Sequence, residues 1–284
     1  MTKVLVTGSR GLLGATLMRV LPEMGFDTVV FEGDVRDRDV VDLAFYEHKI
    51  DWVVHCAAKT SVAECEKNPR LAFEVNTESC RSLVLAARPT GTKIIYISTA
   101  SVFSGEVGGY LEDDTPEPIR VYDQSKREGE LHVLDYDKGM VLRLNLIGLH
   151  PDIPRVKNFM EWLVDAFKSN RDVTLFDDVF INPLSNWSAA RTIGTLIRDD
   201  CKDRVLHIGS RDVLSKAAIG KLVAARFQSY TGKIATGSVD AIGDGVKRPK
   251  LMWLDTHKAH QLLCIRMPML GEEISKIFSR TPIS

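Results

Sequence analysis

The sequence lacks the features that would assign it to a membrane protein or a nucleic-acid-binding protein. No apolar run approaches the roughly 18 residues of a membrane span, and the apolar residues 4–6 are too few for a secretory signal. The net charge is −1 at pH 7, so neither sign is in excess for binding nucleic acid or a charged surface. We therefore expect no membrane segment and no nucleic-acid partner.

Cysteine is also scarce in this chain. Its five cysteines are Cys56, Cys65, Cys80, Cys201 and Cys264, and none forms a C-x-x-C pair. An odd and scattered set does not build a disulfide framework or a zinc site. The sequence therefore predicts reduced thiols, a cytoplasmic protein and no bound metal.

The first half of the chain alternates short apolar runs with amphipathic stretches. The strands expected from this pattern are 3–7, 28–31, 51–55, 93–98 and 140–144, and the expected helices are 12–24, one around 40–44, 71–87 and 122–134. Strands that are apolar on both faces and alternate with helices are typical of a parallel sheet covered on both sides. We predict a doubly wound α/β sheet of the Rossmann type over residues 1–150, which would bind a dinucleotide.

The second half has a less regular pattern. Pro151, Pro154 and Pro183 interrupt it, and helices are expected at 159–167 and 217–227. We expect residues 151–284 to form a smaller, mainly helical lobe that binds the substrate. Some of its segments are expected to return to the dinucleotide-binding domain.

A glycine-rich loop follows the first expected strand and opens the first expected helix. It reads G-x-x-G-x-x-G and comprises Gly8, Ser9, Arg10, Gly11, Leu12, Leu13 and Gly14. The first glycine permits a tight turn, the second lets the backbone approach a pyrophosphate, and the third lets the helix pack closely on the sheet. Free N–H groups and the helix dipole then favour the anion. The loop therefore predicts a dinucleotide site.

Two nearby residues favour different forms of that dinucleotide. Arg10 could bind the 2′-phosphate of NADP through its guanidinium, whereas Glu32 lies where an acidic residue usually marks NAD. Asp34, followed by Val35, is a candidate partner for the adenine amino group. We favour NADP(H), with NAD(H) as the alternative.

A tyrosine and a lysine lie four residues apart in the last expected helix of the first half. In Tyr122-Asp123-Gln124-Ser125-Lys126 this spacing puts both side chains on one helix face. A nearby ammonium favours the phenolate and should lower the pKa of Tyr122, which could then exchange a proton with a carbonyl or alcohol. Thr99, at the end of an expected strand, is our candidate to polarise that carbonyl, with Ser98 and Ser101 as alternatives.

Together these motifs resemble the extended short-chain dehydrogenase/reductases that act on nucleotide sugars. The markers are Gly8/Gly11/Gly14, the Asp34 segment, His55-Cys56-Ala57-Ala58, Val75-Asn76, Thr99, and Tyr122 with Lys126. The resemblance implies that Ala57, Ala58 and Lys59 run along the cofactor and that Asn76 is a structural residue near the site. It also implies that Lys126 holds the nicotinamide ribose.

Within this family the chain is most similar to the dTDP-4-dehydrorhamnose reductase group. The shared stretches are Ala57–Val62 and the run Arg248-Pro249-Lys250-Leu251-Met252-Trp253-Leu254-Asp255-Thr256-x-Lys258. The similarity implies reduction of the 4-keto group of a nucleotide-diphosphate 6-deoxy sugar, with Thr60 and Arg248 near that substrate. It further implies a homodimer, for which the sequence itself shows no interface pattern.

The chain departs from that group where the sugar should lie. Ala100-Ser101 replaces the usual Asp-Tyr after the threonine, and no tryptophan follows Arg143 in Arg143-Leu144-Asn145-Leu146. Ala100, Ser101 and Asn145 are therefore expected to face a sugar or nucleotide that differs from the group's own.

Other reactions of the same scaffold need other residues. Ala100-Ser101 lacks the acid and base of a 4,6-dehydratase, and a serine hydroxyl is a poor base for the C–H abstraction of a combined epimerase/reductase. A nucleotide-sugar 4-epimerase needs only the Thr/Tyr/Lys set and is the alternative enzyme. A non-catalytic NADP-binding regulatory subunit, as in the beta subunit of methionine adenosyltransferase, is the alternative outside catalysis.

Overall fold

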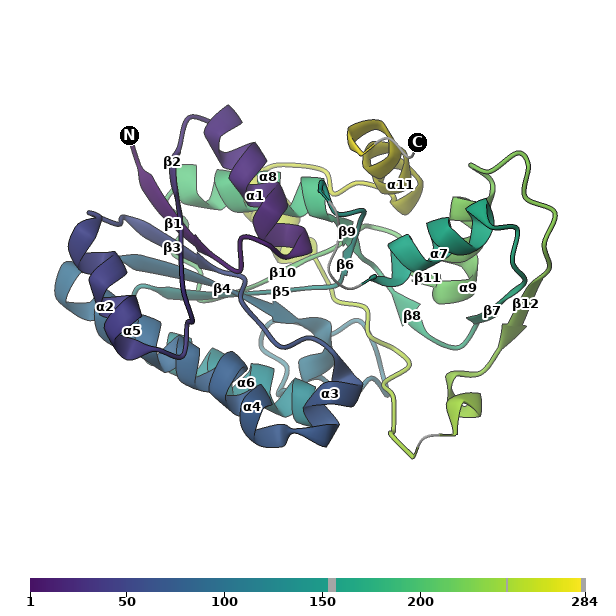
Figure 1. Cartoon of the computed structure of the whole chain (residues 1–284), viewed down its shortest axis with the longest axis horizontal. Helices are drawn as coiled ribbons and strands as arrows, with labels where there is room; N and C mark the ends of the chain where they lie inside the picture. The colour runs from purple at the N-terminus through teal and green to yellow at the C-terminus, as the bar shows by residue number, and fades with distance from the viewer. Residues whose placement is uncertain (153–156, 244, 282–284) are drawn as a thin grey trace.

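A six-stranded parallel sheet forms the centre of the molecule (Figure 1). The computed structural model describes residues 1–152, 157–243 and 245–281. The strand order is β10-β5-β4-β3-β1-β2, and every neighbouring pair is parallel. The strands are β1 (Lys3–Thr7), β2 (Asp27–Val30), β3 (Trp52–His55), β4 (Lys93–Thr99), β5 (Gly139–Leu144) and β10 (Val205–Ile208). The chain reverses direction across the sheet between β1 and β3, so the predicted doubly wound fold is confirmed.

Helices cover both faces of this sheet, as Figure 1 shows. On one face lie α1 (Leu12–Glu23) and α8 (Asn186–Arg198), whose apolar side chains share a core with β1, β3 and β5. On the other face lie α2 (Arg38–Glu47), α5 (Ser79–Thr90) and α6 (Val121–Leu134), which enclose a second core. The inner strands β1, β3, β4 and β5 are buried on both sides, which explains their apolar runs.

The helix expected over 71–87 is longer and irregular. It consists of α4 (Pro69–Phe73), a π-helical turn η1 (Glu74–Glu78) and α5. Asn68 caps its beginning by accepting from the amide of Leu71, and Gly91 ends it with a left-handed φ of 69°. A π turn widens the helix locally and is frequent at functional sites.

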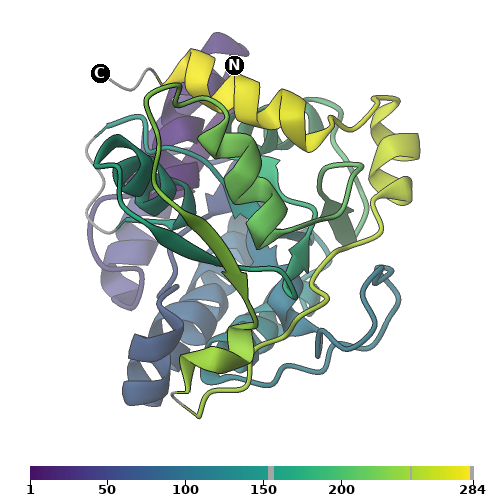
Figure 2. The ribbon, with the colours of Figure 1, turned by 90° about the vertical axis from the view of Figure 1, so that its right-hand side faces the viewer.

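Helices and short strands from residue 146 onward build a lobe beside the carboxyl ends of the strands (Figures 1 and 2). Its core is formed mainly by α7 (Phe159–Lys168), α9 (Lys216–Ala224) and α11 (Leu270–Arg280). Three two-stranded sheets complete it: β6 (Leu146–Ile147) with β9 (Leu184–Ser185), β7 (Val173–Phe176) with β12 (Ile234–Gly237), and β8 (Phe180–Ile181) with β11 (Leu214–Ser215). The shorter elements are α3 (Val62–Lys67), α10 (His257–Leu263), η2 (Ala100–Val102) and η3 (Val239–Ile242).

The second half of the chain also contributes to the central sheet. After α7 and β7–β9 the chain runs through α8, which packs on α1, and into β10, which pairs with β5. The fold therefore interleaves the two halves in sequence. Pro154 lies outside the described residues.

No helix in the described ranges is long and apolar enough to cross a bilayer. The same residues contain no group of three or more His, Cys, Asp or Glu side chains arranged to hold a metal ion.

Candidate active site

The glycine-rich loop connects β1 to α1 and is shaped by two close backbone contacts. Gly8 has a φ of 64°, and a Cβ there would lie 2.6 Å from the amide nitrogen of Ala57. A Cβ on Gly14 would lie 2.2 Å from the carbonyl oxygen of Gly8. No side chain caps α1 at Gly11, so its first amides face outward without a side-chain acceptor. This cradle fits a pyrophosphate at the positive end of the helix.

A cavity of about 560 Å³ lies on one side of the loop. Its lining brings together most of the residues predicted for the adenosine end: Gly8, Ser9, Arg10, Glu32, Asp34, Val35 and Ala57. The Arg10 and Glu32 side chains are both exposed there, so the two opposing signals for NADP and NAD face the same space.

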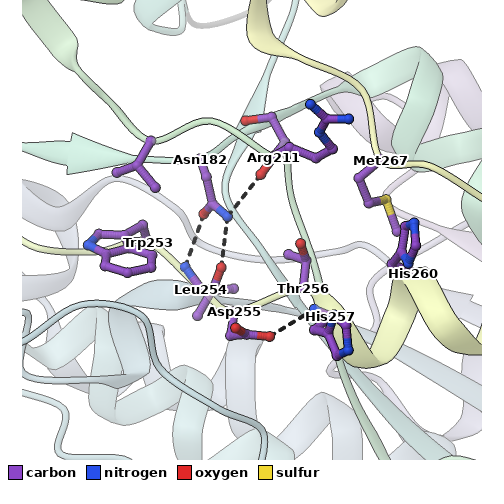
Figure 3. A pocket seen from close by; sticks show the side chains of 11 residues that line it. Asn182, Arg211, Trp253, Leu254, Asp255, Thr256, His257, His260 and Met267 are labelled. Carbon is purple, nitrogen blue, oxygen red and sulfur yellow. Dashed lines mark hydrogen bonds between the residues drawn. The ribbon is translucent and has the colours of Figure 1, made fainter.

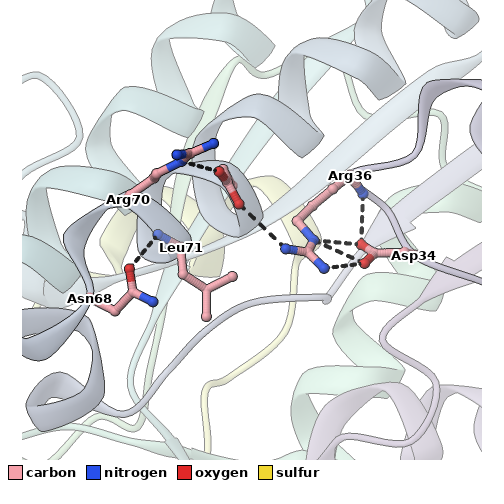
Figure 4. A network of polar contacts seen from close by, with 6 residues as sticks. Asp34, Arg36, Asn68, Arg70 and Leu71 are labelled. Carbon is pink, nitrogen blue, oxygen red and sulfur yellow. Dashed lines mark hydrogen bonds and ion pairs between the residues drawn. The ribbon is translucent and has the colours of Figure 1, made fainter.

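The Asp34 carboxylate, predicted to bind the adenine amino group, is bound by Arg36 (Figure 4). The Arg36 guanidinium donates to both carboxylate oxygens of Asp34, from Nε to Oδ1 at 3.0 Å and from Nη2 to Oδ2 at 2.5 Å. The Arg36 hydrogen bond holds the pKa of Asp34 below its usual value. Arg36 also reaches Glu74 at 3.4 Å, and Glu74 pairs with Arg70. Arg36 was not predicted as a site residue, although its place two residues after Asp34 is the spacing of an Asx-type turn.

A second cavity, of about 430 Å³, begins at the other side of the loop and leads to Tyr122. It brings together most of the predicted catalytic, cofactor and substrate residues: Gly8, Gly11, Leu12, Leu13, Gly14, Ala58, Thr60, Ser98, Thr99, Tyr122, Lys126 and Asn145. It lies at the carboxyl ends of the strands, where ligands bind in doubly wound sheets. We call it the Tyr122 cavity.

The Tyr122 phenol borders this cavity, and its surroundings disfavour the phenolate form. Burial raises its pKa, the negative charge of Asp123 adds to that shift, and a contact with the Thr99 hydroxyl acts in the opposite direction. Asp123 itself is fully buried and pairs with Arg120 at 2.7 Å. A protonated phenol beside a threonine hydroxyl is suited to donate a proton to an oxygen in the cavity.

Lys126 borders the same cavity one helical turn after Tyr122, and its ammonium is bound to the sheet. Its ammonium donates to the carbonyl oxygen of Ile97 at 2.7 Å and lies 3.9 Å from the centroid of the Tyr96 ring. Burial lowers the pKa of Lys126 to about 8. The predicted lowering of the Tyr122 pKa by Lys126 is not seen in this structure, where burial of the phenol is the largest cause and raises that pKa.

Asn76, in the π turn, ties the cofactor loop to the catalytic helix. Its side-chain oxygen accepts from the Lys59 amide at 2.8 Å, and its nitrogen donates to the Lys59 carbonyl at 3.0 Å and to Ser125 Oγ at 2.9 Å. Ser125 lies between Tyr122 and Lys126 on α6. The wider turn at η1 thus places one amide where it holds two parts of the site together.

The residues around Thr99 differ in how they face the cavity. Thr99 Oγ1 accepts from the Ser101 amide at 3.1 Å and donates to Ser101 Oγ at 3.2 Å. Ser101 in turn donates to the sulfur of Met252 at 3.6 Å, and Ala100 is fully buried against Phe103. Ala100 and Ser101 are therefore packed behind Thr99 and do not line the Tyr122 cavity.

Ser98 borders the cavity, but its hydroxyl is directed elsewhere. It donates at 2.5 Å to the carboxylate of Glu130, which is fully buried. The amide of Asn145 donates at 2.6 Å to the Met252 carbonyl, which brings the C-terminal run predicted from resemblance against β5.

Arg248 lies apart from the Tyr122 cavity. It borders another cavity, of about 520 Å³, with Asp178 and Lys250, and donates to the Val246 carbonyl at 3.0 Å. The later part of the same run, Leu254 to His257, lines a further cavity of about 310 Å³ (Figure 3). There the Asn182 side chain holds Leu254 through hydrogen bonds of 2.8 Å and 3.0 Å.

Asn158 also lines the Tyr122 cavity and was not predicted. Its side-chain oxygen caps α7 by accepting from the Glu161 amide at 3.1 Å, and the Glu161 carboxylate accepts from the Asn158 amide at 2.9 Å. The N-x-x-E pattern of this capping box was visible in the sequence as a helix start. Its place beside the catalytic residues depends on how the lobe packs on the sheet.

The fold and the site together define the extended short-chain dehydrogenase/reductase class. The chain belongs to the RmlD substrate binding domain family, whose model matches residues 1–282.

Individual relatives agree with this family. A dTDP-4-dehydrorhamnose reductase from Streptomyces griseus is 41% identical over 223 residues, which cover 76% of this chain and 68% of that protein. The methionine adenosyltransferase 2 subunit beta of Bos taurus is 31% identical over 99% of this chain and 84% of its own length. The crystal structure of a dTDP-4-dehydrorhamnose reductase from Bacillus anthracis str. Ames in complex with NADP superposes with a TM-score of 0.91 at 25% identity, covering 99% of this chain and all of that one.

Proposed function

We propose that this protein reduces the 4-keto group of a nucleotide-diphosphate 6-deoxy sugar with NADPH. The observation that carries the proposal is that Thr99, Tyr122 and Lys126 border one cavity that begins at the glycine-rich loop. The relative from Streptomyces griseus is a dTDP-4-dehydrorhamnose reductase, and the structural neighbour from Bacillus anthracis contains NADP. Both names agree with this reaction.

The cofactor fits the residues that are present. The cradle between Gly8 and Gly14 would take the pyrophosphate, and Arg10 would bind the 2′-phosphate that distinguishes NADP from NAD. When bound, the cofactor supplies the hydride, which is the part of the chemistry that no protein side chain provides.

The chain's own residues supply the proton and the orientation. Thr99 and Tyr122 would hold the keto oxygen between their hydroxyls, and Tyr122 would give its proton to that oxygen. The phenol carries its proton at neutral pH, as a proton donor must. Thr60 and Asn145 border the same cavity and would contact the sugar, and Arg248 stays a candidate substrate contact outside it.

The division of labour between the halves is part of the same proposal. Residues 1–150 would bind the cofactor, and the lobe within 151–284 would bind the nucleotide sugar. Of that range, β10 completes the sheet and α8 packs on α1. A homodimer is a further expectation, which light scattering on the purified protein would test.

The direct test is the loss of reduced-cofactor absorbance when the pure protein meets a dTDP-4-keto-6-deoxyhexose. Stoichiometric loss of NADPH is the expected result. Tight NADPH binding without any loss would contradict a reductase. Interconversion of two nucleotide sugars without net NADPH use would identify the 4-epimerase instead.

A regulatory subunit is the second candidate, since the Bos taurus relative carries the name of such a subunit over nearly the whole chain. Thr99, Tyr122 and Lys126 all border the Tyr122 cavity, which supports catalysis over a regulatory role. Copurification with an enzyme partner and no turnover by the isolated protein would favour the regulatory role.

A further inference from the structure

Glu130 lies on the same face of α6 as Tyr122 and Lys126, one further turn along the helix. Its side chain is fully buried beneath the sheet. Three side chains donate to its carboxylate: Ser98 at 2.5 Å, Arg143 at 2.8 and 2.9 Å, and Arg127 at 2.8 Å. A buried carboxylate is costly unless its lone pairs are satisfied, and here four donors satisfy them.

The partners of Glu130 form one row across the sheet. Ser98 on β4 is the register partner of Arg143 on β5, and Arg143 is the register partner of His207 on β10. His207 contacts Arg143 at 3.3 Å, and burial lowers its pKa to about 3, so it is neutral. Glu130 is therefore the group through which α6 is anchored to the end of β4, where Thr99 follows Ser98.

Lys126 makes the second bond between α6 and this strand, through the Ile97 carbonyl. Two consecutive residues of β4, Ile97 and Ser98, are thus held by two residues of α6 that lie one turn apart. The anchor fixes Thr99 relative to Tyr122, because Thr99 continues the strand and Tyr122 lies one turn before Lys126 on the helix.

The groups that surround the Lys126 ammonium come from four elements. They are His55 and Cys56 at the end of β3, Cys80 on α5, Tyr96 on β4 and Glu130 on α6. His55 is neutral, because burial lowers its pKa to about 3. Burial raises the pKa of both thiols to about 12, so they are neutral too. Of these groups, Glu130 is the carboxylate, and it forms ion pairs with Arg127 and Arg143.

We propose that Glu130 is a positioning residue, which holds Thr99 opposite Tyr122 and keeps the buried Lys126 ammonium charged. The role of Glu130 in keeping Lys126 charged rests on one part of the proposed function, the binding of the cofactor ribose by Lys126. A cofactor-binding measurement tests this role separately from sugar reduction.

The experiment measures NADPH affinity against pH by quenching of tryptophan fluorescence, in the wild type and in Glu130→Gln. Glutamine keeps the shape but removes the charge. We expect the pH above which NADPH affinity falls to move down by about one unit or more. Glu130→Asp, which restores the charge, should return most of that shift. Glu128→Gln, on the exposed side of the same helix, is the matched control and should behave as the wild type.

Ser98→Ala tests the positioning role and leaves the charge of Glu130 in place. We expect turnover to fall about ten-fold, because small displacements of reacting groups are costly, while NADPH affinity and its pH dependence stay unchanged. This variant keeps the Glu130–Arg143 pair, so it tests the positioning role even if Glu130→Gln does not fold.

Two results would overturn the proposal: a wild-type pH limit in folded Glu130→Gln, or wild-type turnover in Ser98→Ala. A shifted pH limit for NADPH binding in a protein that reduces no keto sugar would uphold the role of Glu130 and reject the reductase.

Discussion

Lys126 donates a 2.7 Å hydrogen bond to the carbonyl oxygen of Ile97, on the strand that ends in Thr99. This contact joins α6, the helix that carries Tyr122, directly to β4. It also buries an ammonium, whose pKa is lowered to about 8 by desolvation. The site therefore combines a phenol that keeps its proton with an ammonium that loses its own slightly above neutral pH.

Replacing Tyr122 by phenylalanine removes the proton donor and little else. We expect turnover to fall by about 10² to 10⁴, the usual contribution of a positioned acid. NADPH affinity should change little, since the phenol is assigned to the keto oxygen. Steady-state kinetics and a fluorescence titration measure the two effects, and turnover close to that of the wild type would contradict the role of Tyr122.

NADPH binding should weaken as the pH rises through about 8. The charged form of Lys126 predominates below its pKa and is lost above it, so the interaction with the ribose is present at pH 7 and reduced at pH 9. Lys126→Met should bind NADPH poorly at both values. An unchanged affinity in that variant would remove the ribose from the role of Lys126.

The choice between NADPH and NADH should depend on Arg10 and Glu32, which face the same cavity. Arg10→Ala should weaken NADPH binding by about ten-fold and leave NADH unaffected, because only NADPH carries the 2′-phosphate. Glu32→Ala should increase the preference for NADPH, because it removes a carboxylate that repels the 2′-phosphate. Arg81→Ala, on the exposed side of α5, serves as the control. An equal loss of affinity for NADPH and NADH in Arg10→Ala would indicate that Arg10 contacts the pyrophosphate instead.

A methyl group at Gly14 should disrupt the cofactor loop. A Cβ there lies 2.2 Å from a backbone oxygen that cannot move freely, so we expect Gly14→Ala to cost about 2 kcal/mol or more and to abolish NADPH binding. The matched control is Gly271→Ala, whose Cβ meets nothing within 4 Å in α11. It should be neutral or slightly stabilising. Denaturant unfolding measures the free energy of unfolding of both variants. Equal values for Gly14→Ala and Gly271→Ala would contradict the steric argument.

Short-range patterns predicted much of the site because their geometry is local. The glycine spacing and the Tyr122–Lys126 spacing depend only on a turn and on helical periodicity, so both residue sets border the cavity as expected. The strand alternation likewise predicted the parallel sheet. Arg36 and Asn158 were missed, since an ordinary arginine and an ordinary helix cap become site residues only through what packs beside them.

The sequence by itself determined the doubly wound sheet, the loop that suits a dinucleotide and the residues that could carry the chemistry. Tertiary structure decided which of them meet. It turned Ser98 toward Glu130 and Lys126 toward Ile97, packed Ala100 into the core, and set Arg248 on another cavity. The physical reason is that a pKa and a hydrogen-bond partner depend on burial and on residues far apart in the chain, which periodicity does not encode.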